Sequence, residues 1–123
     1  MLNHIGIVIN EVAEIENFYQ NILGMKIVKQ FKLDRELSNE IFKINKETDV
    51  YMMQKDDLIL ELFITQNPRS ASYDHLCISV LSRKKLIEKA KKDNYSCLII
   101  PRKNYDIVFI KDGSGNIFEV KER

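Results

Sequence analysis

The sequence has few of the residues that mark disordered or cross-linked chains. Four glycines and two prolines occur among 123 residues, of which 45% are hydrophobic and 30% charged. This composition excludes the collagen-like, low-complexity and disordered classes. Only two cysteines are present, Cys77 and Cys97, and they form no Cys-x-x-Cys pair. We therefore expect no disulfide framework and a reducing compartment.

The sequence also lacks an excess of either charge and a long hydrophobic run. Nineteen Lys and Arg residues stand against eighteen Asp and Glu residues, which gives a net charge of +1. This balance favours neither nucleic acid nor an acidic membrane as a partner. No apolar stretch is long enough to cross a bilayer, and the first residues do not resemble a secretion signal. The expectation is one soluble, cytoplasmic domain over residues 1–123.

An internal repeat is the main feature that the sequence does contain. Residues 2–9 and residues 73–80 read as two similar short strands. They place the only histidines of the chain, His4 and His75, at equivalent positions.

A second pair of similar strands closes the two halves. Residues 58–62 align with residues 116–120, so that Glu61 and Glu119 are also equivalent. Each half thus begins with a strand that contains a histidine and ends with a strand that contains a glutamate.

Between these strands, both halves have the same order of expected elements. Apolar residues recur every three or four positions over residues 12–22 and 86–90, which is typical of helices, and Gly24 indicates a helix end. Runs rich in strand-forming residues follow at residues 25–33, 50–54 and 58–64, and again at residues 96–100, 106–111 and 116–121. The sequence predicts an α+β fold of two tandem βαβββ modules with curved mixed sheets, module one over about residues 1–65 and module two over about residues 73–123.

Two segments lie outside this pattern. Residues 65–72 are polar and contain a proline, which favours a connector between the modules. Residues 34–49 are charged and irregular, and we expect a short helix there that runs through Ile41.

The period of two along a strand assigns side chains to the two faces of each sheet. His4 shares a face with Gly6 and Val8, and Glu61 shares a face with Phe63. The opposite faces are apolar and are expected to lie under the helices. One face of each sheet therefore carries the ionisable residues.

Each ionisable residue has an ordinary interpretation when it is considered alone. A histidine near a strand end is commonly packed or solvated, and Glu119 lies near the end of the sequence, where a carboxylate can face water. Glu61 is different because it interrupts the apolar run of residues 58–64. A buried carboxylate there requires a proton, a cation or a metal.

The repeat favours the metal. If an approximate two-fold axis relates the halves, then His4, Glu61, His75 and Glu119 converge on one point. Two imidazoles and two carboxylates suit a divalent transition metal with open positions for water or substrate. The four residues are the predicted metal ligands.

Further motifs lie at residues 2–7, 17–19 with 23–25, 60–62, 74–76 and 112–120. Through these motifs, the sequence resembles the vicinal oxygen chelate superfamily over nearly its whole length. This superfamily includes glyoxalase I, methylmalonyl-CoA epimerase, fosfomycin-resistance thiol transferases, extradiol dioxygenases and bleomycin-binding proteins. In the motif of residues 112–120, Gly113 and Ser114 replace the Pro-Asp of the family pattern.

The resemblance implies curved sheets around a metal-containing cavity, a small-molecule substrate and a homodimer. The implied cofactor is a divalent ion, with nickel, zinc, manganese and iron all open. Glyoxalase I has a glutamate or glutamine at the place of Glu61, whereas the thiol transferases and dioxygenases do not need a ligand there. Glu61 therefore favours a glyoxalase-like or epimerase-like activity.

The expected reaction is that of a metal-dependent lyase or isomerase, which moves a proton next to a carbonyl in a small 2-oxo, hydroxy-carbonyl or thioester substrate. By resemblance, Glu119 is the catalytic base and Glu61 its catalytic partner. Val8 and Thr65 stand where bacterial glyoxalase I has an arginine and an asparagine, which disfavours glutathione as the thiol.

Two alternatives remain open at this point. One is a thiol transferase that opens an electrophile such as an epoxide, and the other is a non-enzymatic protein that binds a drug of the bleomycin type. Cys77 is expected on the face of His75, as a small buried thiol or, alternatively, near the metal. We expect Met52 and Met53 to belong to the core, with a place in the lining of the cavity as the alternative.

Overall fold

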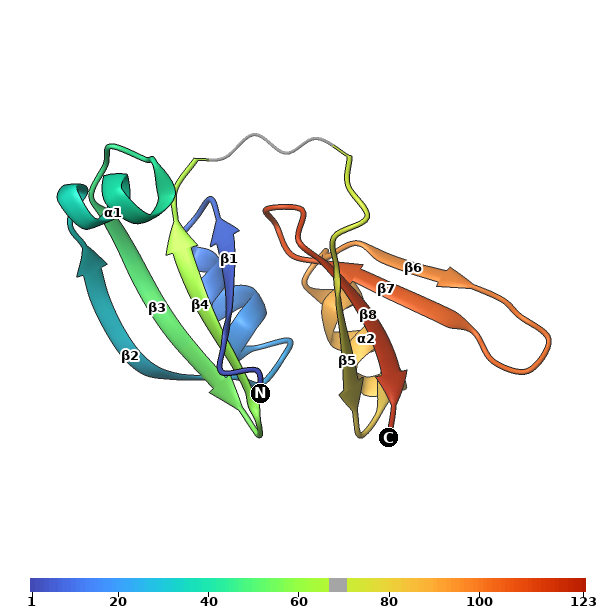
Figure 1. Ribbon diagram of the computed structural model, residues 1–123. Coiled ribbons are helices and arrows are strands. Elements are labelled where there is room, and N and C mark those ends of the chain that lie inside the picture. Colours follow the sequence, from blue (N-terminus) through green and yellow to red (C-terminus); the bar gives the residue numbers. More distant parts are fainter. Residues whose placement is uncertain (67–70) are drawn as a thin grey trace. The chain divides into compact units, whose positions relative to one another are not determined.

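Each half of the chain forms one four-stranded mixed sheet (Figure 1). The computed structural model describes residues 1–66 and 71–123, and the chain divides into two units between residues 67 and 68. Residues 67–70, which are part of the expected connector, lie outside the described residues. Within the described part of the chain, no helix combines the length and the apolar character needed to span a bilayer.

The first unit contains the strand order β1-β4-β3-β2. Strand β1 runs parallel to β4, and the other neighbouring pairs are antiparallel. The elements are β1 (Ile5–Ile9), η1 (Ile15–Gln20), β2 (Lys26–Leu33), α1 (Arg35–Phe42), β3 (Thr48–Lys55) and β4 (Leu58–Ile64).

The second unit repeats this topology with the order β5-β8-β7-β6, in which β5 runs parallel to β8. Its elements are β5 (Leu76–Val80), α2 (Arg83–Lys92), β6 (Cys97–Ile100), β7 (Ile107–Lys111) and β8 (Ile117–Glu122). The predicted α+β fold of two βαβββ modules is confirmed. Helix α1, expected through Ile41, is present as well, and it has no counterpart between β6 and β7.

Helix η1 of the first unit is a π-helix, which the apolar periodicity did not predict. Its wider turns are visible in two i to i+5 hydrogen bonds, from the Asn21 amide to the Glu16 carbonyl and from the Leu23 amide to the Phe18 carbonyl, both 3.0 Å long. The neighbouring residues Phe18 and Tyr19 are both fully buried. Val12, expected on the apolar face, is instead 54% exposed because η1 begins three residues later.

Gly24 ends this helical segment, as predicted. Its φ is +70°, a conformation that favours glycine. The Gly24 amide donates to the Gln20 carbonyl at 3.1 Å, and the Met25 amide donates to the Tyr19 carbonyl at 2.9 Å. The first of these is the bond of an αL helix end, and both satisfy carbonyl groups at the end of the helix.

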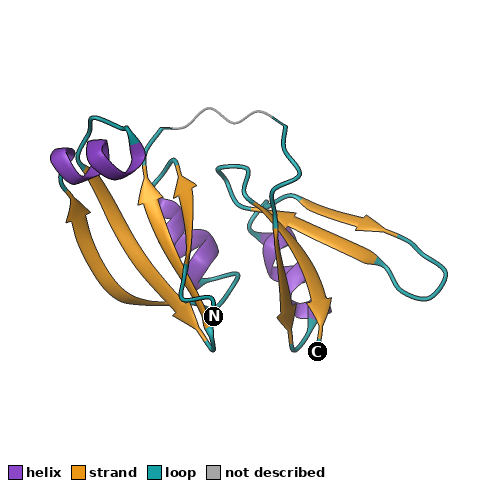
Figure 2. Cartoon of the chain, viewed as in Figure 1, coloured by secondary structure: helices purple, strands orange, loops and turns teal. Residues whose placement is uncertain are grey.

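Each sheet buries one face against a helix of its own unit, η1 in the first unit and α2 in the second (Figure 2). In β4, Leu60 and Leu62 are fully buried, whereas Glu61 and Phe63 point to the other face. In β8, Phe118 and Val120 are buried in the same way. The alternation leaves the second face of each sheet to the predicted site residues.

Candidate functional site

The first candidate pair joins His4, which directly precedes β1, to Glu61 in β4. Glu61 lies opposite Gly6 in the parallel register, so its side chain lies on the His4 face of the sheet. The His4 Nε2 atom is 3.2 Å from Glu61 Oε1, and the two side chains are 41% and 15% exposed. The mostly buried carboxylate of Glu61 therefore has the His4 imidazole as its partner.

The second pair occupies the equivalent place in the second unit. His75 Nε2 lies 3.8 Å from Glu119 Oε2, and the side chains are 42% and 25% exposed. His75 Nδ1 is 2.8 Å from the Tyr73 carbonyl oxygen, which can only accept a hydrogen bond. In a neutral ring, Nδ1 thus carries the hydrogen and Nε2 presents its lone pair toward the carboxylate. The Nε2 lone pair and the Glu119 carboxylate are both acceptors, so a cation or a proton between them would satisfy both. A histidine whose Nε2 is oriented in this way is suited to be a metal ligand.

Phe109 and Cys77 surround the second pair. Both lie opposite Glu119 in the sheet, on β7 and β5 respectively. The rings of His75 and Phe109 pack edge to face with their centroids 6.1 Å apart.

Cys77 is exposed, so the expectation of a buried thiol was wrong. It lies on the site face of the edge strand β5, opposite Glu119, which is the face that the strand period predicted. Partial burial raises the pKa of the Cys77 thiol, and the charge and hydrogen bond of Glu119 raise it further. At neutral pH the residue is therefore a neutral thiol beside the carboxylate.

A tight turn before β8 sets the position of Glu119. The buried carboxylate of Asp112 accepts hydrogen bonds through Oδ1 from the amides of Ser114 and Asn116, at 2.9 and 2.8 Å. Its Oδ2 accepts a third from Asn116 Nδ2 at 2.7 Å. Gly115 has a φ of +88°. This network explains the Asp, Gly and Asn positions of the last motif, because it starts the strand that presents Glu119.

Neither pair is a complete metal site by itself. Within the described residues of each unit, no three His, Cys, Asp or Glu side chains gather into a group that can hold a metal ion. Each pair offers one nitrogen and one oxygen donor, the same combination in both units.

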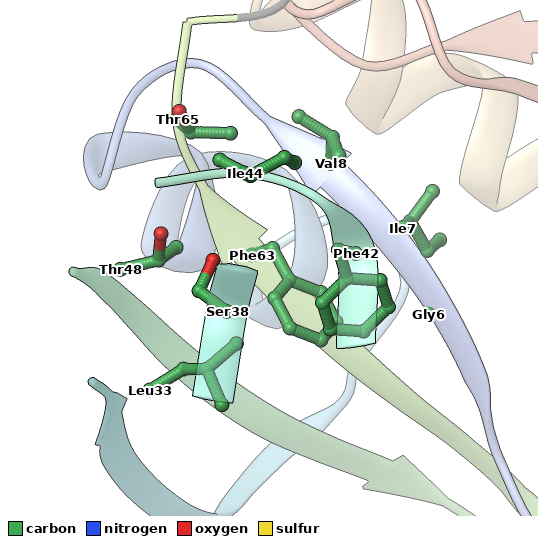
Figure 3. Close-up of a pocket in the computed structure, with 10 residues that line it drawn as sticks. All are labelled: Gly6, Ile7, Val8, Leu33, Ser38, Phe42, Ile44, Thr48, Phe63 and Thr65. Carbon is green, nitrogen blue, oxygen red and sulfur yellow. The ribbon is translucent and has the colours of Figure 1, made fainter. Parts of the chain in front are cut away.

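Hollows adjoin both pairs on the sheet faces that carry them. In the second unit, a hollow of about 550 Å³ is lined by His75, Phe109 and Lys111, among other residues. In the first unit, an apolar pocket of about 170 Å³ lies between the sheet and α1 (Figure 3). The sequence reasoning missed Lys111 and α1 as parts of these hollows. The available signal for α1 was Phe42, an aromatic residue within the charged, irregular segment of residues 34–49.

The two methionines that were expected in the core, Met52 and Met53, lie on opposite faces of the sheet. Met53 is fully buried in the core. Met52 lies opposite Glu61 in the register, and so it belongs to the face that carries the candidate pair.

A family model for the glyoxalase/bleomycin resistance protein/dioxygenase superfamily matches residues 1–120. The chain belongs to this superfamily. The resemblance found in the sequence is thereby confirmed. A sequence comparison of this superfamily member with curated proteins finds no match.

Solved structures of the superfamily share the fold at low identity. A glyoxalase family protein from Enterococcus faecalis is 19% identical with a TM-score of 0.72, and the match covers 98% of this chain and 95% of that one. The fosfomycin resistance protein FosX from Listeria monocytogenes is 14% identical with a TM-score of 0.77, over 100% of this chain and 93% of that one. A variant of FosX, 14% identical with a TM-score of 0.74 over 98% and 88% of the chains, is a complex with Mn(II) and 1S,2S-dihydroxypropylphosphonic acid. At these identities, the similarity supports the fold alone.

Proposed function

We propose that the protein is a metal-dependent lyase or isomerase that moves a proton on the carbon next to a carbonyl group. The substrate is a small 2-oxo, hydroxy-carbonyl or thioester compound. The observation that carries the proposal is the repeated pairing of an imidazole with a carboxylate, His4 with Glu61 and His75 with Glu119. Membership of the superfamily adds independent support.

The four residues together are the ligands of one divalent ion in this proposal. Two nitrogen and two oxygen donors suit nickel, zinc, manganese or iron. When bound, the ion supplies Lewis acidity that stabilises negative charge on a carbonyl oxygen. The FosX complex with Mn(II) is a precedent for a divalent ion in this fold.

Glu119 is the proposed base. Its carboxylate is more exposed than that of Glu61, and its 3.8 Å separation from His75 is longer than a hydrogen bond. Glu119 is therefore held less firmly than Glu61, and when it is displaced from the ion it can turn toward a substrate carbon in the neighbouring hollow and take its proton. Glu61, held by His4 at 3.2 Å, returns the proton or stays in place as a ligand. The Tyr73 carbonyl keeps His75 in the tautomer that orients Nε2.

A second candidate is the opening of an electrophile, such as an epoxide, by a thiol. Lys111 favours it, because this residue lines the same hollow as His75 and its positive charge can bind an anionic electrophile. A third candidate, a non-enzymatic drug-binding protein, needs no ion and makes no use of the two donor pairs.

Metal analysis separates the enzymes from the binder. Protein purified without chelator is expected to contain one divalent ion per chain by mass spectrometry of the elements, and Glu61→Gln and His4→Ala to contain much less. Glu88→Gln, an exposed position on α2, is the control that keeps the ion. Wild-type protein without any bound ion after incubation with each of the four metals would contradict the proposal.

Solvent exchange separates the two enzyme reactions. The wild-type protein is expected to move deuterium from D2O into the carbon next to the carbonyl of a suitable 2-oxo compound, detected by NMR, and Glu119→Gln to lose this activity. The alternative result is that the protein consumes an epoxide in the presence of a thiol and that Glu61→Gln keeps this activity. This result would favour the second candidate, the thiol transferase. Light scattering after size exclusion tests the homodimer, which is also part of the proposal.

A further inference from the structure

The apolar pocket of the first unit lies on the same sheet face as His4 and Glu61. Gly6 and Val8 follow His4 at intervals of two along β1, and their partners in the register are Glu61 and Phe63. Gly6, Val8 and Phe63 all line the pocket. Because a strand advances about 3.3 Å per residue, the row of Val8 and Phe63 lies about 7 Å beyond the row of Glu61. The pocket thus begins next to the candidate pair.

Helix α1 forms the outer wall of this pocket. Asp34 caps the helix by accepting a 2.8 Å hydrogen bond from the Leu37 amide. Ser38 faces the sheet and is 2% exposed. At the end of the helix, the ring of Phe42 packs edge to face on Phe63 with their centroids 5.5 Å apart (Figure 3). The pocket therefore depends on an element that has no counterpart between β6 and β7 of the second unit.

The size and chemistry of the pocket limit what it can hold. Its volume of about 170 Å³ is close to that of an apolar cavity of about 150 Å³ that stays dry and binds one benzene molecule. Its lining consists of aliphatic and aromatic side chains, three hydroxyl groups and the Gly6 backbone, without a charged side chain. An ionic group would lose its hydration there without compensation, whereas an apolar ring or branched chain of about six carbons gains by burial.

We propose that this pocket binds the apolar substituent of the substrate, a group about the size of a phenyl ring. The inference rests on the proposed function and specifies its substrate: a carbonyl compound whose reacting group meets His4 and Glu61 while its aryl or branched alkyl group lies between Phe63 and α1. The pocket selects such compounds over those with only a methyl substituent, because a methyl group leaves most of its apolar lining unfilled.

Toluene is the probe for the pocket, and its binding requires neither an ion nor a reaction. In NMR spectra of methyl groups, toluene is expected to shift the signals of Val8 and Leu33, both of which line the pocket. Ser38→Leu fills the space and is expected to weaken toluene binding at least tenfold. Ile41→Ala is the matched control, because Ile41 lies on the same helix, is 58% exposed and does not line the pocket. Its affinity for toluene is expected to stay within twofold of the wild type.

A second variant guards against a folding defect in Ser38→Leu. Gly6→Ala adds one methyl group at the opposite wall and is expected to weaken toluene binding by a smaller factor. Folded Ser38→Leu and Gly6→Ala proteins that bind toluene as tightly as the wild type would overturn the proposal. Shifts confined to methyl groups outside the pocket would overturn it as well.

A turnover comparison links the pocket to the reaction. The substrates compared are the hydrates of a phenyl-substituted and a methyl-substituted 2-oxo aldehyde, in which the proton leaves the hydrated carbon and is returned to the ketone carbon to give a 2-hydroxy acid. With the metal-loaded protein, the ratio of kcat/KM for the phenyl over the methyl compound is expected to fall at least tenfold in Ser38→Leu and to remain unchanged in Ile41→Ala. An unchanged ratio in Ser38→Leu contradicts the assignment of the pocket. If toluene binds as expected but no ion and no exchange are found, the proposed function fails and the apolar site remains.

Discussion

Phe63 lies against Gly6 so closely that a Cβ atom on Gly6 would stand 3.3 Å from Cε2 of the Phe63 ring. The two residues are on neighbouring parallel strands, and both line the apolar pocket. The glycine therefore gives the aromatic ring room to lie over the backbone of β1. Because the ring borders open space, it can also move away from an added atom.

We expect Gly6→Ala to be tolerated by the fold. The Phe63 ring can shift by a few tenths of an ångström into the pocket, and an alanine in a strand costs less backbone entropy than glycine. The free energy of unfolding, measured by urea denaturation, is expected to change by about 1 kcal/mol or less in either direction. A loss several times larger would show that Phe63 is fixed by Phe42 and cannot yield.

Asp112 is expected to be essential for the turn that presents Glu119. Asp112→Ala removes the carboxylate that accepts three hydrogen bonds inside the buried turn. The free energy of unfolding is expected to fall by about 2–3 kcal/mol, since hydrogen bonds to a charged group are among the stronger ones. Asp106→Ala, at an exposed position before β7, is the control and is expected to change stability by about 0.5 kcal/mol or less. Equal effects of the two substitutions would contradict the role of the turn.

Gly24 is expected to resist substitution because of its backbone conformation. Gly24→Ala places a side chain at a φ of +70° and brings its Cβ to 3.2 Å from Lys55 Nζ, which donates to the Leu23 carbonyl. The expected loss of stability is about 1–2 kcal/mol, read from the midpoint and slope of urea unfolding. Gly24→Asn is expected to lose less, because asparagine tolerates the left-handed conformation better.

The control for this effect is Gly113→Ala, since the φ of Gly113 is not positive and the residue is exposed. A loss at Gly113 equal to that at Gly24 would exclude backbone strain as the cause.

The reactivity of Cys97 is expected to be low at neutral pH. Burial raises the pKa of the Cys97 thiol, and the nearby Lys91 ammonium opposes this increase. A raised pKa means less thiolate at a given pH, so the rate of alkylation by iodoacetamide is expected to rise through a midpoint above that of free cysteine. The measurement uses a Cys77→Ser background, so that one thiol reacts.

Lys91→Ala is expected to move this midpoint to still higher pH, because it removes the charge that favours the thiolate. Lys84→Ala, in the first turn of the same helix, is the matched control. A midpoint at or below that of free cysteine would contradict the assignment of burial as the dominant influence.

The internal repeat was sufficient to predict the fold from the sequence. The equivalence of His4 with His75 and of Glu61 with Glu119 predicted two modules, and the alternation around Glu61 predicted which face would be buried. These features were accessible because strand and helix periods are properties of residues close together in the chain. The π-helix was not predicted, because the apolar periodicity did not distinguish its wider turn, in which the neighbouring residues Phe18 and Tyr19 are both buried, from that of an α-helix.

The candidate site was predicted to a different extent. The sequence by itself predicted its four donor residues and their division between the halves, since motifs and strand periods depend on residues close together in the chain. Only the tertiary structure decided that His4 meets Glu61 at 3.2 Å, that Cys77 is exposed beside Glu119, and that α1 closes an apolar pocket over Phe63. Contacts between residues far apart in the chain depend on distances and orientations in three dimensions, and no local periodicity specifies them.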